Sequence, residues 1–169
     1  MQVYEAIRTV LAIRDYNPEP LSSEVVHKIL EAGRLTASSM NRQPWHFIAV
    51  TAREDLETLG EMANTGPYIA EAGFAVAVAI EPTKFAESDA SRAIQSMILT
   101  AWERGVASNW VGFYGLEEAH EFLGIPDDIK LLAIVPFGYS DEISTQGKKQ
   151  RKPFSEVIHG GRFGQEFDG

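Results

Sequence analysis

The chain has 169 residues, of which 44% are hydrophobic and 23% are charged, and this composition is typical of a globular protein with one core. A formal net charge of −9 argues against nucleic acid as a partner, and the longest apolar run, Phe74–Ile80, is too short to span a membrane. The absence of cysteine excludes disulfide bonds, thiolate metal sites and cysteine nucleophiles. Because the N-terminus also lacks an apolar secretory segment, we expect a cytoplasmic protein.

The first third of the chain predicts two amphipathic helices, a polar loop and a strand. The first helix stops before the turn-rich segment 17–20, and its apolar positions are Val3, Ile7, Val10 and Leu11. Ser22 or Ser23 caps the second helix, which ends near Gly33. Its apolar face consists of Val25, Val26, Ile29 and Leu30. Residues 34–45 are polar and irregular, and a short strand is expected at 47–51.

The remainder of the chain alternates between helices and strands. A helix around 54–63 precedes the wholly apolar segment Phe74–Ile80, which is typical of a strand covered on both faces. The longest helix is predicted at 89–104, and Gly105 ends it. The last predicted elements are a strand at 109–113, a helix at 116–123 and a strand at 131–137. With no repeat or linker, residues 1–169 are expected to form a single domain.

The polar segment after Tyr139 concentrates positive charge in an otherwise acidic chain. Four of the fifteen basic residues fall within five positions, namely Lys148, Lys149, Arg151 and Lys152. Such a cluster is consistent either with a solvated tail or with a site for an anion.

Several common enzyme motifs are absent from the sequence. There is no Gly-x-Gly-x-x-Gly motif, no phosphate-binding loop and no Gly-x-Ser-x-Gly nucleophile motif. The four histidines, at positions 27, 46, 120 and 159, are far apart and do not form a metal-binding pattern. We therefore expect no metal site.

The polar segment 36–47, with the sequence TASSMNRQPWHF, leads directly into a predicted strand. Its polar groups could match the donors and acceptors of a planar heterocycle, with Trp45 packed underneath. Those groups belong to Ser38, Ser39, Asn41 and Gln43. The alternative is a well-capped connection between a helix and a strand, and the residues by themselves leave both interpretations open.

Taken in order, the motifs of the chain resemble those of the nitroreductase family, which are flavin mononucleotide (FMN) dependent NAD(P)H oxidoreductases. The matching segments are AIRTVLAIRDYNPEPL, SSMNRQPWHF, TGPYIAEAGFAVAVAI, SDASRAIQSMILTAWERGVASNWVGF, LGIPDDIKLLAIVPFGY and KKQRKPFSEVI. The resemblance implies an α+β fold with a central, mainly antiparallel sheet flanked by helices. It also implies a homodimer with FMN at the interface, and a tail, 141–169, that contributes to the phosphate site and the dimer.

The resemblance also assigns roles around the flavin ring. Arg14 matches the basic residue beside the N1 and C2 carbonyl edge, where a cation stabilises the negative charge that arises when the flavin accepts hydride. The loop residues that match those lying against the ring, in the family usually from the partner subunit, are Ser38, Ser39, Met40 and Asn41. Gln43 of the same segment is also expected to bind the cofactor. Gly112, after Val111, matches the position whose backbone N–H reaches flavin N5.

For the phosphate, the resemblance assigns Lys149 and Arg151 as ligands in the tail. The chain departs from the family where many members have an Arg-Arg-Ser or similar polar set, because it carries Val10, Leu11 and Ala12 there. Possible substitutes are Arg8 and Arg92, although a surface ion pair is the favoured interpretation of Arg92. A family asparagine has Asn64 or Thr65 as its match, and the loop proline is replaced by Ala37.

The function implied by the resemblance is a ping-pong transfer of hydride from NADH or NADPH, through FMN, to a small electrophile such as a nitroaromatic or a quinone. No catalytic side chain is needed, because the chemistry takes place on the cofactor. Two alternatives remain: an FMN-dependent dehalogenase or flavin-fragmenting enzyme of the same fold, and a non-catalytic flavin-binding module. The broad apolar face of helix 89–104 is consistent with dimerisation and equally with burial inside a monomer.

Overall fold

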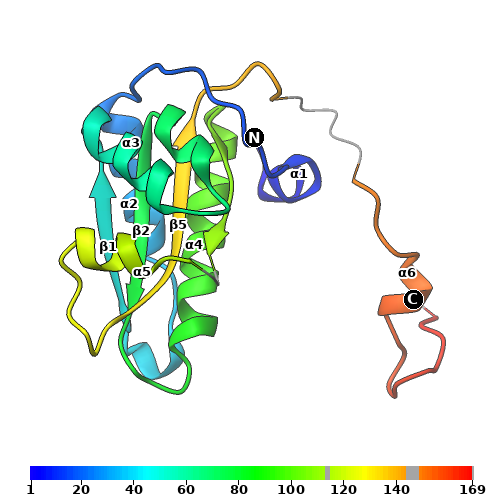
Figure 1. Ribbon diagram of the computed structural model, residues 1–169. Coiled ribbons are helices and arrows are strands. Elements are labelled where there is room, and N and C mark those ends of the chain that lie inside the picture. The colour runs from blue at the N-terminus through cyan, green and yellow to red at the C-terminus, as the bar shows by residue number, and fades with distance from the viewer. Residues whose placement is uncertain (113–114, 144–148, 169) are drawn as a thin grey trace.

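A five-stranded antiparallel sheet forms the centre of the protein (Figure 1). The structure is a computed structural model that describes residues 1–112, 115–143 and 149–168. The strands are β1 (Trp45–Val50), β2 (Phe74–Ile80), β3 (Ala107–Ser108), β4 (Val111–Gly112) and β5 (Lys130–Gly138). Their order is β1-β2-β5-β3, and β4 also pairs with β5. The expected α+β fold with a mainly antiparallel sheet is confirmed.

Helices cover both faces of this sheet (Figure 1). On one face, the valines of β2 pack against α2 (Ser23–Arg34) and α4 (Ala86–Glu103). On the other face, its alanines pack against α3 (Arg53–Met62), α5 (Glu117–Phe122) and the 3-10 helix η2 (Pro67–Glu71). Every residue of β2 is buried, as predicted from its unbroken apolar sequence.

The helices occupy the predicted parts of the chain, and local features explain their ends. Ser22 caps α2, since its Oγ accepts a hydrogen bond from the backbone N–H of Val25 at 3.3 Å. Near the other end of α2, a Cβ on Gly33 would lie 3.0 Å from Met97 Sδ of α4, so the glycine permits close packing of the two helices. Helix α4 begins at Ala86, three residues earlier than expected, and Gly105 follows it in a left-handed conformation.

The first helix is shorter than predicted. Helix α1 (Val3–Thr9) ends before Val10, and the next residues run alongside β3 instead. Ala12 forms a parallel bridge with Ser108, whose carbonyl also accepts a hydrogen bond from the N–H of Ile13 at 3.1 Å. The apolar residues that follow Thr9 therefore pack in an extended segment, which a helical periodicity alone does not distinguish from one more helical turn.

Within the described part of the strand predicted at 109–113, the structure has only β4 (Val111–Gly112), because residues 109–110 connect it to β3, which lies before the predicted range; both strands pair with β5. Ala107 pairs with Gly138 and Val111 with Ile134, so Asn109 would oppose Pro136 if the register were continuous. Proline has no backbone N–H to donate, and this interrupts the ladder. The last predicted residue, Phe113, lies outside the described residues.

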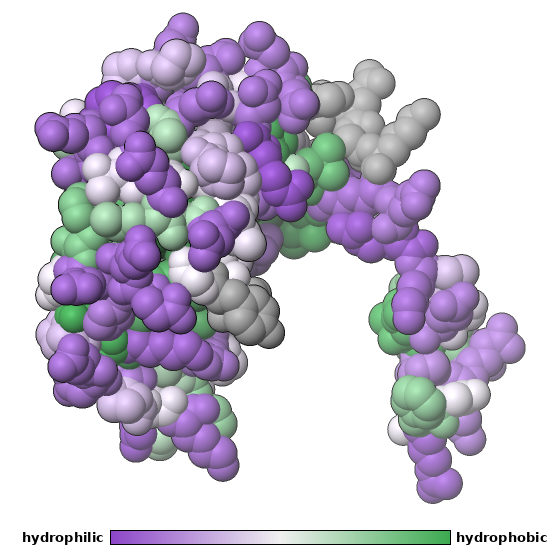
Figure 2. Space-filling model, in the orientation of Figure 1, coloured by the Kyte–Doolittle hydropathy of each residue, from purple (hydrophilic) through white to green (hydrophobic). Residues whose placement is uncertain are grey.

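The C-terminal arm, residues 149–168, begins beside α1 and then extends away from the sheet and its helices (Figures 1 and 2). It contains the short helix α6 (Phe154–Val157) and several large apolar side chains that are at least half exposed. These side chains are Phe154, Val157, Phe163 and Phe167. Across the described parts of the chain, no helix combines the length and apolar character that crossing a membrane requires.

Candidate functional site

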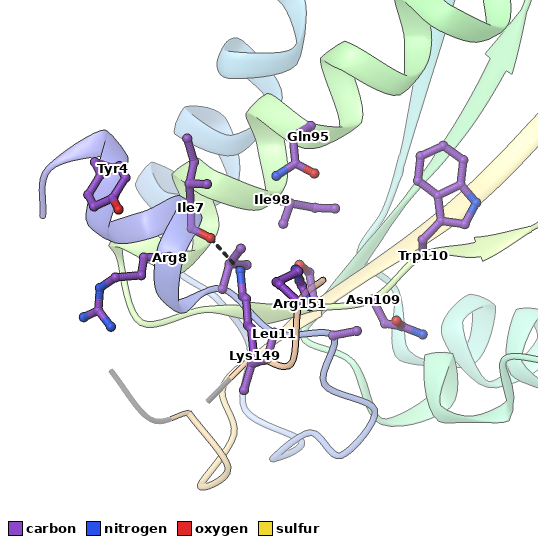
Figure 3. Close-up of a pocket in the computed structure, with 13 residues that line it drawn as sticks. Tyr4, Ile7, Arg8, Leu11, Gln95, Ile98, Asn109, Trp110, Lys149 and Arg151 are labelled. Atoms are coloured by element: carbon purple, nitrogen blue, oxygen red, sulfur yellow. Dashed lines mark hydrogen bonds between the residues drawn. The ribbon is translucent and has the colours of Figure 1, made fainter. Parts of the chain in front are cut away.

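A cavity of about 910 Å³ lies where the two ends of the chain meet α4 and the region of β3 and β4 (Figure 3). Helix α1 and the extended segment after it form one wall, and α4 and the connection from β3 to β4 form another. The arm contributes two cationic residues. The lining residues are Tyr4, Ile7, Arg8, Val10, Leu11, Ala12, Gln95, Ile98, Ser108, Asn109, Trp110, Lys149 and Arg151.

The cations from the arm are positioned beside α1. Lys149 Nζ donates a hydrogen bond to the backbone carbonyl of Ile7 at 2.5 Å, which ties the arm to the helix (Figure 3). Burial of the Lys149 ammonium lowers its pKa, and the positive charge of Arg151 lowers the pKa further. An anion beside these two groups would relieve their repulsion, so this end of the cavity is suited to a phosphate.

Arg8 also lines the cavity, but its charge is already paired. Its Nε and Nη2 donate hydrogen bonds to Glu5 Oε2 at 3.1 and 2.8 Å. Hydrogen bonding from Arg8 lowers the pKa of the Glu5 carboxyl group, which keeps the pair ionised. The guanidinium points away from Lys149 and Arg151 (Figure 3). Because Arg8 is engaged with Glu5, it is a weaker anion ligand than the two cations from the arm.

The segment that departs from the family pattern forms an apolar side of the cavity. Val10, Leu11 and Ala12 all line it, together with Ile98 of α4. Carbon side chains offer no hydrogen bonds to a phosphate, and they suit the uncharged part of an amphipathic ligand. Cations at one end and an apolar wall beside them therefore fit FMN in chemical character, although with fewer phosphate donors than an Arg-Arg-Ser sequence would provide.

A buried polar side chain also borders the cavity, at the connection between β3 and β4. The side chain of Asn109 is 6% exposed, and its Nδ2 donates a hydrogen bond to the hydroxyl of Tyr68 in η2. This bond joins the cavity wall to the segment that enters β2.

The predicted flavin loop does not line this cavity. Its central part is the 3-10 helix η1 (Ser39–Asn41), which is held against Asp89 in the first turn of α4. Ile98, which lines the cavity, is nine residues further along the same helix, a distance of about 14 Å along its axis. Within one chain, the loop and the phosphate end of the cavity are therefore separate.

Five other predicted residues also lie outside the cavity lining, namely Arg14, Asn64, Arg92, Val111 and Gly112. Arg14 is exposed and comes two residues after Ala12. Asn64 is beside Gly115, because a Cβ on that glycine would lie 2.6 Å from Asn64 Nδ2. Val111 is 1% exposed and its side chain is in the core, so only its backbone is available to a ligand. Arg92 forms an ion pair with Asp89, as its favoured interpretation predicted.

Gly112 has a structural reason to be glycine. A Cβ at this position would lie 2.8 Å from Trp110 Nε1 and 2.9 Å from the carbonyl oxygen of Leu132. The absence of a side chain therefore serves the packing of β4 against β5, in addition to any approach of a ligand to the backbone.

The cavity brings together three of the predicted site residues, Arg8, Lys149 and Arg151. Sequence reasoning missed the lining residues of α4 and of the connection between β3 and β4, namely Gln95, Ile98, Ser108, Asn109 and Trp110. These residues come together because α4 packs against β3, and no motif in the sequence around them indicates this packing. Among the residues that the structure describes, no group of three or more histidines and acidic residues is arranged to hold a metal ion.

Comparison with known proteins identifies the relatives of this chain. The family model described as "Nitroreductase family" matches residues 8–81 and 67–139. A protein of Archaeoglobus fulgidus named "Putative NADH dehydrogenase/NAD(P)H nitroreductase" is 36% identical, over 79% of this chain and 82% of its own. A protein of the same name from Methanothermobacter thermautotrophicus is 33% identical, over 84% of this chain and 79% of its own.

Solved structures agree with these relatives. A crystal structure of the same description, from Parabacteroides distasonis, superimposes with a TM-score of 0.86 at 28% identity and covers 96% of this chain and 99% of its own. An "FMN-dependent Nitroreductase" from Clostridium difficile has a TM-score of 0.83 at 25% identity, over 95% and 99% of the two chains. The family model, the curated relatives and the fold lead to one conclusion: the chain belongs to the nitroreductase family.

Proposed function

We propose that this protein is an FMN-dependent oxidoreductase that uses NADH or NADPH to reduce a small electrophile, such as a nitroaromatic or a quinone. The observation that carries the proposal is the meeting of Lys149 and Arg151 with α1 and the β3–β4 region in one cavity. Relatives named as NAD(P)H nitroreductases, and the structural neighbour described as FMN-dependent, support the same activity.

In this proposal, the chain's own residues bind and orient the cofactor. Lys149 and Arg151 hold the phosphate, and the wall of Val10, Leu11 and Ala12 packs against the uncharged part. Next to the cavity, the backbone N–H of Gly112 would serve the ring of the cofactor, and Arg14 would stabilise negative charge at the edge of the ring. Asn64 and the backbone of Val111 complete the surroundings of the ring.

When bound, FMN supplies the redox chemistry by accepting hydride from the nicotinamide and delivering reducing equivalents to the acceptor. The two substrates use the same open cavity in turn, which is a ping-pong order. The protein therefore needs no nucleophilic side chain, in agreement with the absence of nucleophile motifs from the sequence.

The proposal includes a homodimer with two sites at the interface. Support comes from the loop 38–43, which does not line the cavity of its own chain, and from Met40, which is 70% exposed within that loop. The arm also carries exposed phenylalanines that a second copy would bury (Figure 2). In this arrangement residues 1–169 form a single domain, and its tail, 141–169, contributes to both the phosphate site and the dimer.

The decisive experiment is a visible absorbance spectrum of the purified protein, or of protein reconstituted with FMN, before and after anaerobic addition of NADH or NADPH. We expect flavin bands that bleach with the reductant and return when a quinone or nitroaromatic is added. A protein that binds no FMN would overturn the proposal. Bound FMN that neither nucleotide reduces would instead indicate a non-catalytic flavin-binding module.

Analysis of the products distinguishes the proposed oxidoreductase from an FMN-dependent dehalogenase or a flavin-fragmenting enzyme of the same fold. After turnover, chromatography should recover intact FMN together with reduced acceptor. Breakdown of the flavin, or release of halide from a halogenated substrate in preference to reduction of a quinone, would replace the proposed acceptor chemistry and leave the cofactor assignment in place.

A further inference from the structure

The loop that contains η1 concentrates unfavourable backbone geometry. Met40, Asn41 and Gln43 have φ values of 53°, 54° and 52°, and no other described non-glycine residue has a positive φ. A left-handed conformation is unfavourable for residues with a Cβ, and three of them in four positions persist only if the surroundings enforce them. Some feature of the structure must therefore hold this loop in place.

Asp89 is the group that holds it. Its carboxylate accepts a hydrogen bond from the backbone N–H of Ser39 at 3.0 Å, through Oδ2, and one from Ser39 Oγ at 3.1 Å, through Oδ1. The residue is 1% exposed, whereas its ion-pair partner Arg92 is 53% exposed. A carboxylate buried to this extent is costly unless it is fully hydrogen-bonded, so the loop and Asp89 stabilise each other.

Hydrogen bonds within the loop connect the part held by Asp89 to the residues that face outward. Ser38 Oγ accepts from the N–H of Gln43 at 2.9 Å, and Gln43 Nε2 donates to the carbonyl and the side-chain oxygen of Asn41, both at 3.3 Å. Met40, between these anchored positions, points its side chain to the exterior. The loop thus presents a fixed backbone on the surface of the molecule.

We infer that Asp89 is a positioning residue, which fixes the loop 38–43 in the conformation that it presents to the flavin bound by the partner chain. This inference rests on the proposed function, and Asp89 itself does not touch the cofactor. Holding the loop before the cofactor arrives lowers the entropy that must be lost on binding, so the anchor contributes to flavin affinity across the dimer interface.

The test compares Asp89→Asn and Asp89→Ala with the wild-type protein. Asparagine has the size of aspartate but only one acceptor oxygen, and alanine removes both acceptors. Ser91→Ala is the matched control, because Ser91 is exposed on the same helix and its Oγ donates to Glu87 within α4. The first readout is backbone hydrogen exchange in the FMN-free protein, and the second is the apparent Kd for FMN.

We expect faster exchange in peptides that span residues 36–44 of Asp89→Ala, with unchanged exchange in the core strands. The Kd for FMN should rise by about tenfold, because both hydrogen bonds from Ser39 to Asp89 are lost and the loop must regain its order on binding. Asp89→Asn should have a smaller effect in the same direction, and Ser91→Ala should behave like the wild type. Because asparagine preserves the volume at this position, this variant tests the inference even if Asp89→Ala fails to fold.

A double-mutant cycle with Ser39→Ala shows whether Asp89 acts through the loop. If it does, the effects of Ser39→Ala and Asp89→Ala on the Kd for FMN are less than additive, because both remove the same contact. Unchanged exchange in 36–44, or faster exchange with unchanged FMN affinity, would overturn the inference. Failure of the proposed function would have a different signature, since the wild-type protein itself would then bind no FMN.

Discussion

The two regions assigned to the flavin are built in opposite ways. The loop 38–43 is held by a buried carboxylate and by hydrogen bonds within the loop, whereas Lys149 and Arg151 come from a C-terminal arm that is largely exposed. The loop is held by several hydrogen bonds, whereas among the described residues the arm is tied to the rest of the chain by the hydrogen bond from Lys149 to the carbonyl of Ile7. We therefore expect the loop to position the flavin ring and the arm to bind the phosphate through its charge.

The largest effect on FMN binding is expected when both cations of the arm are removed. In Lys149→Gln/Arg151→Gln, the Kd for FMN should rise by about 100-fold, because two charge-assisted hydrogen bonds to phosphate are lost. Fluorescence titration measures it, and Lys152→Gln is the matched control, since Lys152 belongs to the same arm but does not line the cavity. Affinity for riboflavin, which lacks the phosphate, should be unchanged, and an equal loss for riboflavin would refute the assignment.

A substitution in the apolar wall should increase the affinity for FMN. Ala12 lines the cavity at a position where many family members have a polar residue, and its side chain is exposed. In Ala12→Ser, the new hydroxyl should tighten FMN binding by about threefold, the value of one neutral hydrogen bond. Ala12→Val is the control, because it adds bulk without a donor. If serine and valine weaken binding equally, the wall does not approach the polar part of the cofactor.

Release of Arg8 from Glu5 should have a smaller effect. Both side chains are exposed, so their ion pair contributes little to stability, and Glu5→Gln should leave the Tm almost unchanged. The freed guanidinium should strengthen FMN binding by about twofold at low salt, and the gain should disappear as salt rises. Titrations at two ionic strengths test this, with Arg8→Gln in the same background as the control that abolishes the gain.

The dependence of binding on pH is the mildest expected effect. Burial and the neighbouring Arg151 lower the pKa of Lys149 from the ordinary value of 10.5, so its ammonium loses a proton at a lower pH than a free lysine does. Phosphate favours the protonated form of Lys149. FMN affinity should therefore be constant between the second pKa of the phosphate, about 6, and the lowered pKa of Lys149, and should fall as pH rises through the latter. Lys149→Gln should remove this decrease, and riboflavin titrated in parallel reports the ionisation of the flavin itself. A decrease that persists in Lys149→Gln would assign it to another group.

Sequence reasoning located most elements because each has a local cause. The unbroken apolar run predicted β2, and the serine before the second helix marked its cap. The ordered motifs singled out Lys149 and Arg151 of the basic tail, which line the cavity. The interruption between β3 and β4 was missed because Pro136, which causes it, is in a different strand. Asp89 was missed for the same reason, since its partner, Ser39, is fifty residues away. Contacts between distant segments depend on packing, and neither periodicity nor spacing encodes them.

The hydrogen bond between Lys149 and Ile7 joins two parts of the cavity that are synthesised at different times. The two residues are 142 positions apart, so the cations are synthesised long after the wall of the cavity that α1 forms. Domains begin to fold from the N-terminus during translation, and the sheet is encoded before residue 149. Every strand of the sheet is therefore synthesised before the charge that attracts a phosphate. A chain that stopped just before the arm would keep every strand of the sheet and lack these two cations, so we expect it to lose affinity for the phosphate.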